Sequence, residues 1–198
     1  MLILSVVIIV AAYLLGSLNC AILVCRALQL PDPRAQGSGN PGATNVLRLG
    51  GKKAAAITLA GDTLKGLIPV LVAKMAGLSD IAIILTGLAA FFGHLYPLFF
   101  QFKGGKGVAT ALGVFTGVSW LLGLALLVTW LVIAKLSRIS SLAALTSAIL
   151  APVYAWFMLD NGAYTVMMIL CSGVLIWRHQ GNIRRLLSGE EGNFKKPS

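Results

Sequence analysis

Long apolar runs of helical length, separated by short polar segments, constrain this chain more than any other feature. A stretch of about 20 apolar residues can cross a bilayer as a helix. Hydrophobic residues make up 58% of the 198 positions and charged residues only 11%, which excludes an ordinary soluble domain. The sequence therefore predicts an all-α, polytopic integral membrane protein. Its apolar runs are Met1–Val24, Ala54–Met75, Ile81–Phe102, Val108–Ala134, Ser140–Leu159 and Ala163–Trp177.

The run over 108–134 decides how many times the chain crosses the membrane. It could form one long helix, or two short helices broken around Gly117 and Ser119. The break places nearly all the basic residues on the inner side, as the positive-inside rule requires, whereas one helix would put the basic C-terminus outside. We therefore predict seven transmembrane helices, with the N-terminus outside and the C-terminus in the cytoplasm. With no internal repeat in the chain, we expect a single membrane-embedded domain over residues 1–198.

The net charge of +10 is carried by residues that gather in clusters between the apolar runs. This placement indicates that the basic residues set the membrane topology and contact anionic lipids. It argues against nucleic-acid binding. The three cysteines, Cys20, Cys25 and Cys171, lie in or at the ends of apolar runs. We expect them to be reduced thiols, and no spacing of Cys and His predicts a metal site.

The first polar segment, Gly37–Lys53, has the composition of an anion-binding site, rich in glycine and small polar side chains and free of acidic residues. Asn40 and Pro41 predict an N-cap and a first helical residue, with a short helix to about Leu49 that ends at Gly50–Gly51. The positive end of this helix would face a phosphate or a carboxylate near Ser38. The alternative is a flexible linker between two membrane helices.

One face of the same short helix would present Thr44, Asn45 and Arg48, because these residues lie three or four positions apart. An arginine in this position can bind phosphate oxygens in a bidentate manner.

The second polar segment, KGGKG over 103–107, lacks the glycine spacing and the Ser or Thr of a nucleotide-binding P-loop. Its glycines and lysines can still hold a phosphate, although the lysines could instead only anchor the preceding span. The third polar segment is the tail from Arg178, where His179 and Asn182 lie one helical turn apart. His94, at the end of an apolar run, is expected to pack between helices.

Asp62 and Lys65, in the sequence GDTLKG, are three residues apart and can form an ion pair inside the second apolar run. Such a pair is costly in a membrane unless it faces a polar site. It could lock helices together or line the active cleft, and the sequence leaves both roles open.

Four blocks, GSGNPGATNVLR, GDTLKG, GHLYPLFFQFKGGKGVATALG and RHQGNIRRLLSGEE, resemble those of the bacterial acylphosphate:glycerol-3-phosphate acyltransferase family, PlsY. The resemblance implies an enzyme of the bacterial inner membrane with its active site on the cytoplasmic side. It implies transfer of a fatty acyl group from acyl phosphate to the 1-position of glycerol 3-phosphate. An organophosphate transporter or channel is the alternative. The absence of charge in the apolar run over 108–134 argues against transport.

By the resemblance, Ser38 and the backbone of the first polar segment would bind acyl phosphate, and cationic and polar side chains would bind glycerol 3-phosphate. No cofactor, metal or protein partner is expected, and the partners are the two substrates and membrane lipids. The expected catalytic residues are Ser38, Arg48, Lys106 and His179. The expected substrate-binding residues are Gly39, Asn40, Gly42, Thr44, Asn45, Lys103, Gly104, Gly105 and Asn182.

Overall fold

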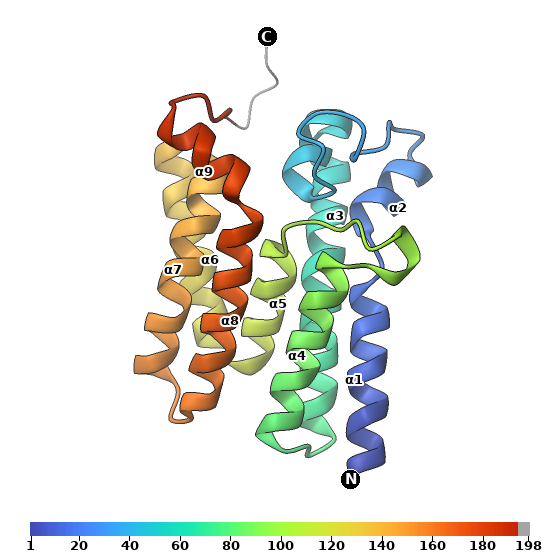
Figure 1. Cartoon of the computed structure of the whole chain (residues 1–198), viewed down its shortest axis with the longest axis vertical. Helices are drawn as coiled ribbons and strands as arrows, with labels where there is room; N and C mark the ends of the chain where they lie inside the picture. The colour runs from blue at the N-terminus through green and yellow to red at the C-terminus, as the bar shows by residue number, and fades with distance from the viewer. Residues whose placement is uncertain (194–198) are drawn as a thin grey trace. The chain divides into compact units, whose positions relative to one another are not determined.

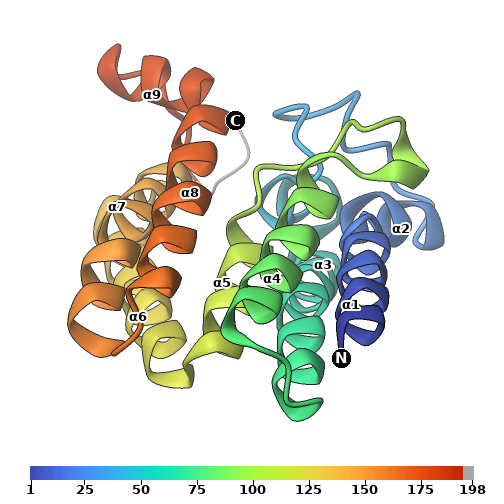
Figure 2. The same cartoon turned by 60° about the horizontal axis from the view of Figure 1, so that its bottom comes forward.

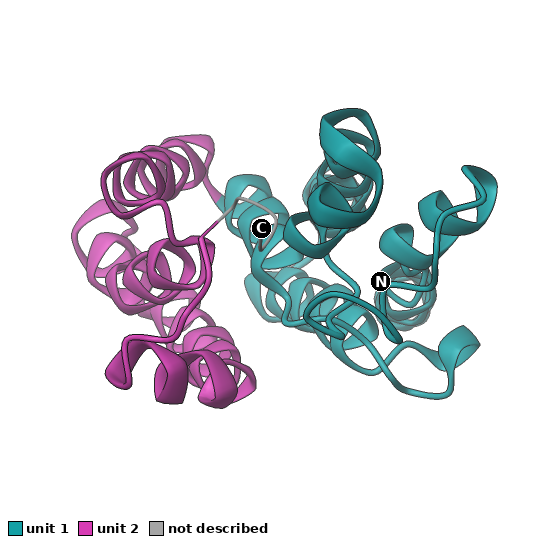
Figure 3. Ribbon diagram, turned by 90° about the horizontal axis from the view of Figure 1, so that it is seen from above, with its two compact units in different colours: residues 1–118 teal, residues 119–198 magenta. Residues whose placement is uncertain are grey.

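The computed structural model describes residues 1–193, and this part of the chain contains helices and no strand (Figures 1 and 2). The all-α prediction is therefore confirmed. The chain divides into two compact units, Met1–Val118 and Ser119 onward (Figure 3). The elements are α1 (Leu2–Gly16), α2 (Cys20–Ala27), α3 (Ala43–Met75), α4 (Asp80–Leu95), η1 (Leu98–Phe100), α5 (Val108–Val118), α6 (Trp120–Ser137), α7 (Ser140–Met158), α8 (Gly162–Arg178) and α9 (Gln180–Leu187).

Within the described residues, four helical segments are long and apolar enough to cross a membrane, or five if the bent pair α1–α2 counts as one span. Two further apolar helices, α5 and α8, are shorter. The chain is thus multi-pass, while the count of seven spans remains a prediction. The two helices expected within 108–134 are present as α5 and α6, and Ser119 caps α6 by accepting a hydrogen bond from the Leu122 amide at 3.4 Å.

The first apolar run is not the continuous helix that its composition predicts. It breaks after Gly16, and α2 leaves α1 at an angle of 46°. Asn19 caps α2, because its Oδ1 accepts a hydrogen bond from the Ile22 amide at 3.2 Å. The break leaves the carbonyl group of Leu18 outside any helix, and the buried Lys65 Nζ donates to it at 2.6 Å. A lysine from another helix therefore compensates a broken span, as a membrane requires.

The long helix α3 carries a second lysine with a similar role. Lys74 Nζ donates to the carbonyl oxygens of Gly117 and Val118, at 3.3 and 2.9 Å, where α5 ends. The helix itself is interrupted at Gly51, whose φ of +76° lies in the left-handed region. This interruption confirms the predicted end of the short first helix at Gly50–Gly51.

The helices of unit 1 pack at backbone contact distance through glycine. A Cβ on Gly113 of α5 would collide with the carbonyl oxygen of Thr63 on α3, and a Cβ on Gly66 of α3 would collide with that of Thr110. Small residues at such crossings allow close packing of membrane helices. The α3–α5 contact is therefore specified by the absence of side chains.

We predict that Gly113→Ala lowers the thermal stability of the protein in detergent by at least about 3 °C. The added methyl group meets rigid backbone, and overpacking of this kind costs about 1–3 kcal/mol. Gly173→Ala is the matched control, because its Cβ would meet nothing within 4 Å. Equal melting temperatures for the two variants would show that α3 and α5 separate at no cost.

Unit 2 consists of α6 to α9. Thr129 of α6 and Tyr154 of α7 share a hydrogen bond at 3.0 Å between their hydroxyl groups, which ties these two helices together within the membrane span. Asn161, between the last two apolar runs, caps α8 by accepting a hydrogen bond from the Ala163 amide at 2.9 Å. α9 follows α8 directly at His179.

Candidate functional site

The first polar segment is folded around the side chain of Asn45, which is only 1% exposed. Its Oδ1 accepts a hydrogen bond from the Ser38 amide at 2.9 Å. Its Nδ2 donates to the carbonyl oxygens of Pro33 and Gln36 at 2.8 and 2.9 Å. Asn45 thus joins the start of α3 to the loop before it, and holds the backbone at Ser38 in place.

The helix of this segment begins later than the sequence predicts. Gly42, not Asn40, is the N-cap, and Ala43 is the first residue of α3. The Gly42 amide donates back to the Asn40 carbonyl at 2.9 Å, so Asn40 and Pro41 form a tight turn that cannot belong to a helix. The prediction of an N-cap at Asn40 was therefore wrong, although the helix terminus still follows Ser38 and Gly39 closely.

An ion pair at the entry of this loop went unnoticed in the sequence. Arg34 donates from Nε and Nη2 to both carboxylate oxygens of Asp32, with the shortest distance at 2.6 Å. These hydrogen bonds and the positive charge lower the pKa of Asp32 below its usual value. The pair lies two residues apart and serves to shape the loop.

The second polar segment packs against the C-terminal end of α4. The Gly105 amide donates to the His94 carbonyl at 3.3 Å. A Cβ on Gly105 would collide with His94 Nε2, and a Cβ on Gly104 would collide with the His94 carbonyl oxygen. The same Cβ on Gly105 would lie 3.1 Å from the Pro41 carbonyl oxygen, so the first and second polar segments meet here within unit 1.

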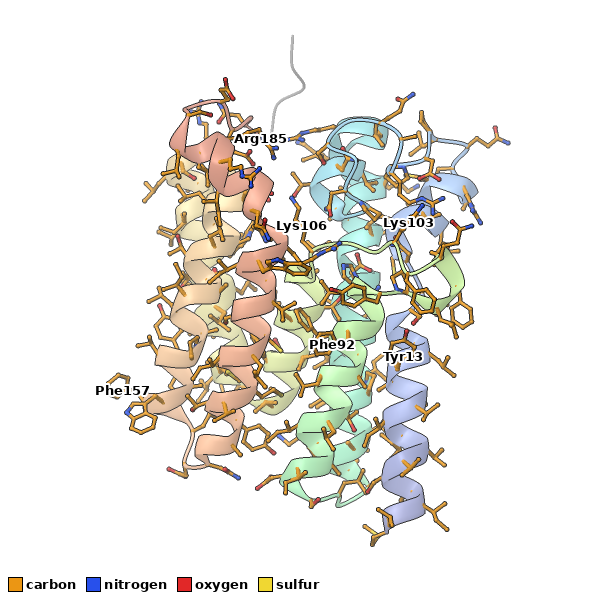
Figure 4. All side chains as sticks on the ribbon, viewed as in Figure 1. Tyr13, Phe92, Lys103, Lys106, Phe157 and Arg185 are labelled. Carbon is orange, nitrogen blue, oxygen red and sulfur yellow. The ribbon has the colours of Figure 1, made fainter. Side chains whose placement is uncertain are left out.

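The two segments lie at the same end of unit 1, opposite the N-terminus (Figures 1 and 2). Lys103 and Lys106 lie on the loop between α4 and α5 (Figure 4). Lys103 is exposed and Lys106 is half-buried, while Gly104 and Gly105 are buried. The prediction of a phosphate-binding loop is consistent with this arrangement of two lysines around buried glycine.

Beneath this loop lies the ion pair expected from GDTLKG. Lys65 Nζ and Asp62 Oδ1 are 2.8 Å apart, and His94 Nδ1 lies 3.6 Å from the same oxygen. All three side chains are less than 5% exposed. His94 packs between helices, as expected, and it also lies beside the carboxylate of Asp62.

The third polar segment is organised by the turn from α8 into α9. His179 is 3% exposed and its Nδ1 lies 2.8 Å from the Leu175 carbonyl oxygen. A carbonyl oxygen only accepts, so Nδ1 is the donor in this hydrogen bond, and in a neutral ring Nε2 is then an acceptor. Asn182 is also buried, one turn further on.

Glu191 returns from the tail to this turn and accepts three side-chain hydrogen bonds. Its Oε1 accepts from Ser141 at 2.6 Å and from Asn182 Nδ2 at 2.5 Å, and its Oε2 accepts from Arg185 Nε at 2.7 Å. Burial by itself would raise the pKa of Glu191, but these hydrogen bonds and the charge of Arg185 outweigh it and lower the pKa. Glu191 and Ser141 therefore hold Asn182 in place.

The lowered pKa predicts a dependence of stability on pH. A carboxyl group whose pKa is lower in the folded state stabilises the protein above its ordinary value of 4.5, and this contribution is lost as the pH falls through the folded pKa. We expect Glu191→Gln to melt several degrees lower than the parent at pH 7, and the difference to shrink as the pH falls below 4.5. Melting curves across this range test it. A difference that is constant with pH would contradict it.

The structure thus brings together the predicted residues of the first two segments in unit 1, and those of the third in unit 2. Ser38 and Gly39 are exposed at the loop, whereas Asn40, Gly42, Thr44 and Arg48 are partly buried around the start of α3. Sequence reasoning missed Ser141, which lies in an apolar helix, and Asp32. The structure also shows an ion pair between Glu191 and Arg185.

Comparison with known proteins agrees with these features. A family model described as glycerol-3-phosphate acyltransferase matches residues 6–189. A protein of this name from Methylococcus capsulatus is 58% identical, over 92% of each chain. Another from Methylobacillus flagellatus is 55% identical, over 98% of this chain and 99% of its own.

Solved structures with the same fold include two of PlsY, an integral membrane glycerol 3-phosphate acyltransferase. The glycerol 3-phosphate form superposes with a TM-score of 0.92 at 42% identity, over 96% of both chains. The lysophosphatidic acid form has a TM-score of 0.89 at the same identity, over 96% of this chain and 94% of its own.

Proposed function

This chain belongs to the glycerol-3-phosphate acyltransferase family, and we propose that it transfers a fatty acyl group from acyl phosphate to the 1-position of glycerol 3-phosphate. The products are lysophosphatidate and phosphate. The observation that carries the proposal is the superposition, over 96% of this chain, with an acyltransferase in its glycerol 3-phosphate and lysophosphatidic acid forms. Lysophosphatidic acid is glycerol 3-phosphate with one acyl group added, so the two forms correspond to the substrate and the product of one acylation.

We assign the acyl-phosphate end to Ser38 and the backbone from Gly39 to Gly42, and glycerol 3-phosphate to Arg48, Lys106, His179 and Asn182. The assignment is supported by chemistry. The loop held by Asn45 presents small residues at the start of α3, where backbone N–H groups attract an anion. The other residues supply cations and donors for a second phosphate.

The proposed reaction is direct. The 1-hydroxyl oxygen of glycerol 3-phosphate forms a bond to the acyl carbon, and the bond from that carbon to the phosphate oxygen breaks. Phosphate is a good leaving group, so an acyl-enzyme is not needed, and orientation of two anionic substrates by cations supplies much of the rate. The hydroxyl proton passes to a phosphate oxygen of the donor, or to His179 Nε2 as the alternative base.

The activity is tested by incubating the purified protein in detergent with palmitoyl phosphate and glycerol 3-phosphate. Lysophosphatidate must form. Palmitoyl-CoA, supplied in place of palmitoyl phosphate, must give no product. No compartments exist in detergent, so a transporter would give no product. A stable labelled acyl adduct on Ser38, trapped without acceptor, would overturn the direct reaction.

We predict that His179→Ala raises the KM for glycerol 3-phosphate at least about tenfold and changes kcat by less than about threefold. With a phosphate oxygen as the proton acceptor, His179 contributes binding rather than base catalysis, and loss of binding appears in KM. Steady-state kinetics with palmitoyl phosphate in excess measure both constants. A collapse of kcat at saturating acceptor would identify His179 as the base.

We further propose seven spans in the bacterial inner membrane, with the N-terminus outside and the site facing the cytoplasm. The five long or bent spans together with α5 and α8 supply the segments, and the clustering of basic residues supports the orientation. In a cysteine-free background, Asp160→Cys should react with a membrane-impermeant maleimide in intact cells, and Lys52→Cys should not. Labelling of both or of the reverse pattern would reject this topology.

A further inference from the structure

The ion pair inside unit 1 is expensive for a purely structural device. Asp62 and Lys65 are 2% and 4% exposed, and they lie on a helix that is long and apolar enough to cross the membrane. Burying two charges costs several kcal/mol per ion, and apolar side chains of similar volume stabilise a fold equally well or better. In a bilayer the cost is at least as high. Stability alone does not account for the pair.

The pair is connected to the second polar segment through His94. Asp62 Oδ1 lies 2.8 Å from Lys65 Nζ and 3.6 Å from His94 Nδ1. On its other edge, the His94 ring lies directly beneath Gly105, where there is no room for a Cβ next to Nε2. The backbone of the same histidine accepts the Gly105 amide hydrogen bond at 3.3 Å. His94 therefore has the acid on one side and the loop on the other.

The other end of the network is tied to the first span. Lys65 Nζ also donates to the Leu18 carbonyl, at 2.6 Å, where α1 and α2 separate. Three segments of unit 1 therefore converge on two charges: the break after α1, the middle of α3, and the end of α4. The His94 ring packs against this anchored carboxylate, with Nδ1 3.6 Å from Asp62 Oδ1.

We propose that Asp62, Lys65 and His94 are positioning residues for the acyl transfer. They hold the loop 103–107, and with it Lys106, at the height and angle that glycerol 3-phosphate requires. This inference rests on the proposed function of Lys106 in binding glycerol 3-phosphate. None of the three side chains touches substrate, and each acts through the next.

The first test replaces the pair by apolar side chains of similar size, Asp62→Leu with Lys65→Met. Hydrogen–deuterium exchange followed by mass spectrometry reports the loop directly, because the Gly105 amide is bonded to His94. We expect amide exchange over 103–107 to accelerate at least about tenfold, while exchange in α5 and in α8 is unchanged. We also expect the KM for glycerol 3-phosphate to rise at least about tenfold, with the KM for palmitoyl phosphate unchanged.

Lys74→Met is the matched control. It removes a lysine from the same helix that also caps carbonyl groups at a break, those of Gly117 and Val118. A structural role would make the two variants alike, with melting temperature and activity falling together. A positioning role predicts that Lys74→Met leaves loop exchange and both KM values within about twofold of the parent.

His94→Asn keeps the test decisive if the double variant does not fold. It leaves Asp62 paired with Lys65 and removes the ring atoms beneath Gly105, so the same loosening of 103–107 and the same change in KM are expected. Unchanged loop exchange in this variant would overturn the inference. The exchange measurement does not require activity. If the protein fails to acylate glycerol 3-phosphate while exchange over 103–107 responds as expected, the proposed function is refuted and the network is not.

Discussion

Replacing Asn45 with aspartate is expected to lower kcat/KM at least about 100-fold, although the two side chains have the same shape. Nδ2 of Asn45 donates to two carbonyl oxygens, of Pro33 and Gln36. An aspartate would turn an oxygen toward them, so three acceptors would face one another in a buried site. Each buried acceptor left unpaired costs about 1–3 kcal/mol. The loop must rearrange, and the backbone at Ser38 moves with it.

Steady-state kinetics with palmitoyl phosphate and glycerol 3-phosphate measure this effect, and a displacement of about 1 Å is enough to cause it. Asn161→Asp is the matched control. There the amide oxygen caps α8 by accepting from Ala163, a contact that aspartate retains, so activity should remain within about twofold. If Asn45→Asp keeps more than a tenth of the parent activity, the loop does not need this side chain for its position.

The spans could be predicted because a membrane leaves the backbone few choices. The interruption at Gly51 and the break at Ser119 were both anticipated from glycine, from a short polar side chain and from the distribution of charge. These signals are local in the sequence. The break between α1 and α2 was missed because the group that makes it tolerable, Lys65, lies 47 residues from Leu18.

The candidate site shows the same division. The residue types of the first polar segment predict an anion site, but they do not predict that Asn45 faces inward to hold the loop. The partners of Asn45 lie in an irregular loop, and the path of this loop depends on contacts that do not follow the periodicity of a helix. Likewise, Ser141 gives no signal in an apolar run, because Glu191 reaches it from 50 residues away.

The largest effect in the second polar segment is expected for Gly105→Ala, which should raise the KM for glycerol 3-phosphate at least about 100-fold. The new methyl group would collide with the His94 ring, and it would also lie 3.1 Å from the Pro41 carbonyl oxygen. The ring is 4% exposed and lies beside Asp62, so it has no space to withdraw into. The loop with Lys106 must lift instead. Steady-state kinetics at saturating palmitoyl phosphate measure the change.

Gly162→Ala is the control for this substitution, because a Cβ there meets nothing within 4 Å and its kinetics should match the parent. A double-mutant cycle identifies the cause of the loss. If the collision with the ring is responsible, adding Gly105→Ala to His94→Asn should cost less than about tenfold, because the ring atoms that block the methyl group are gone. Additive losses in the cycle would mean that Gly105 is needed for its backbone conformation, independently of the histidine beneath it.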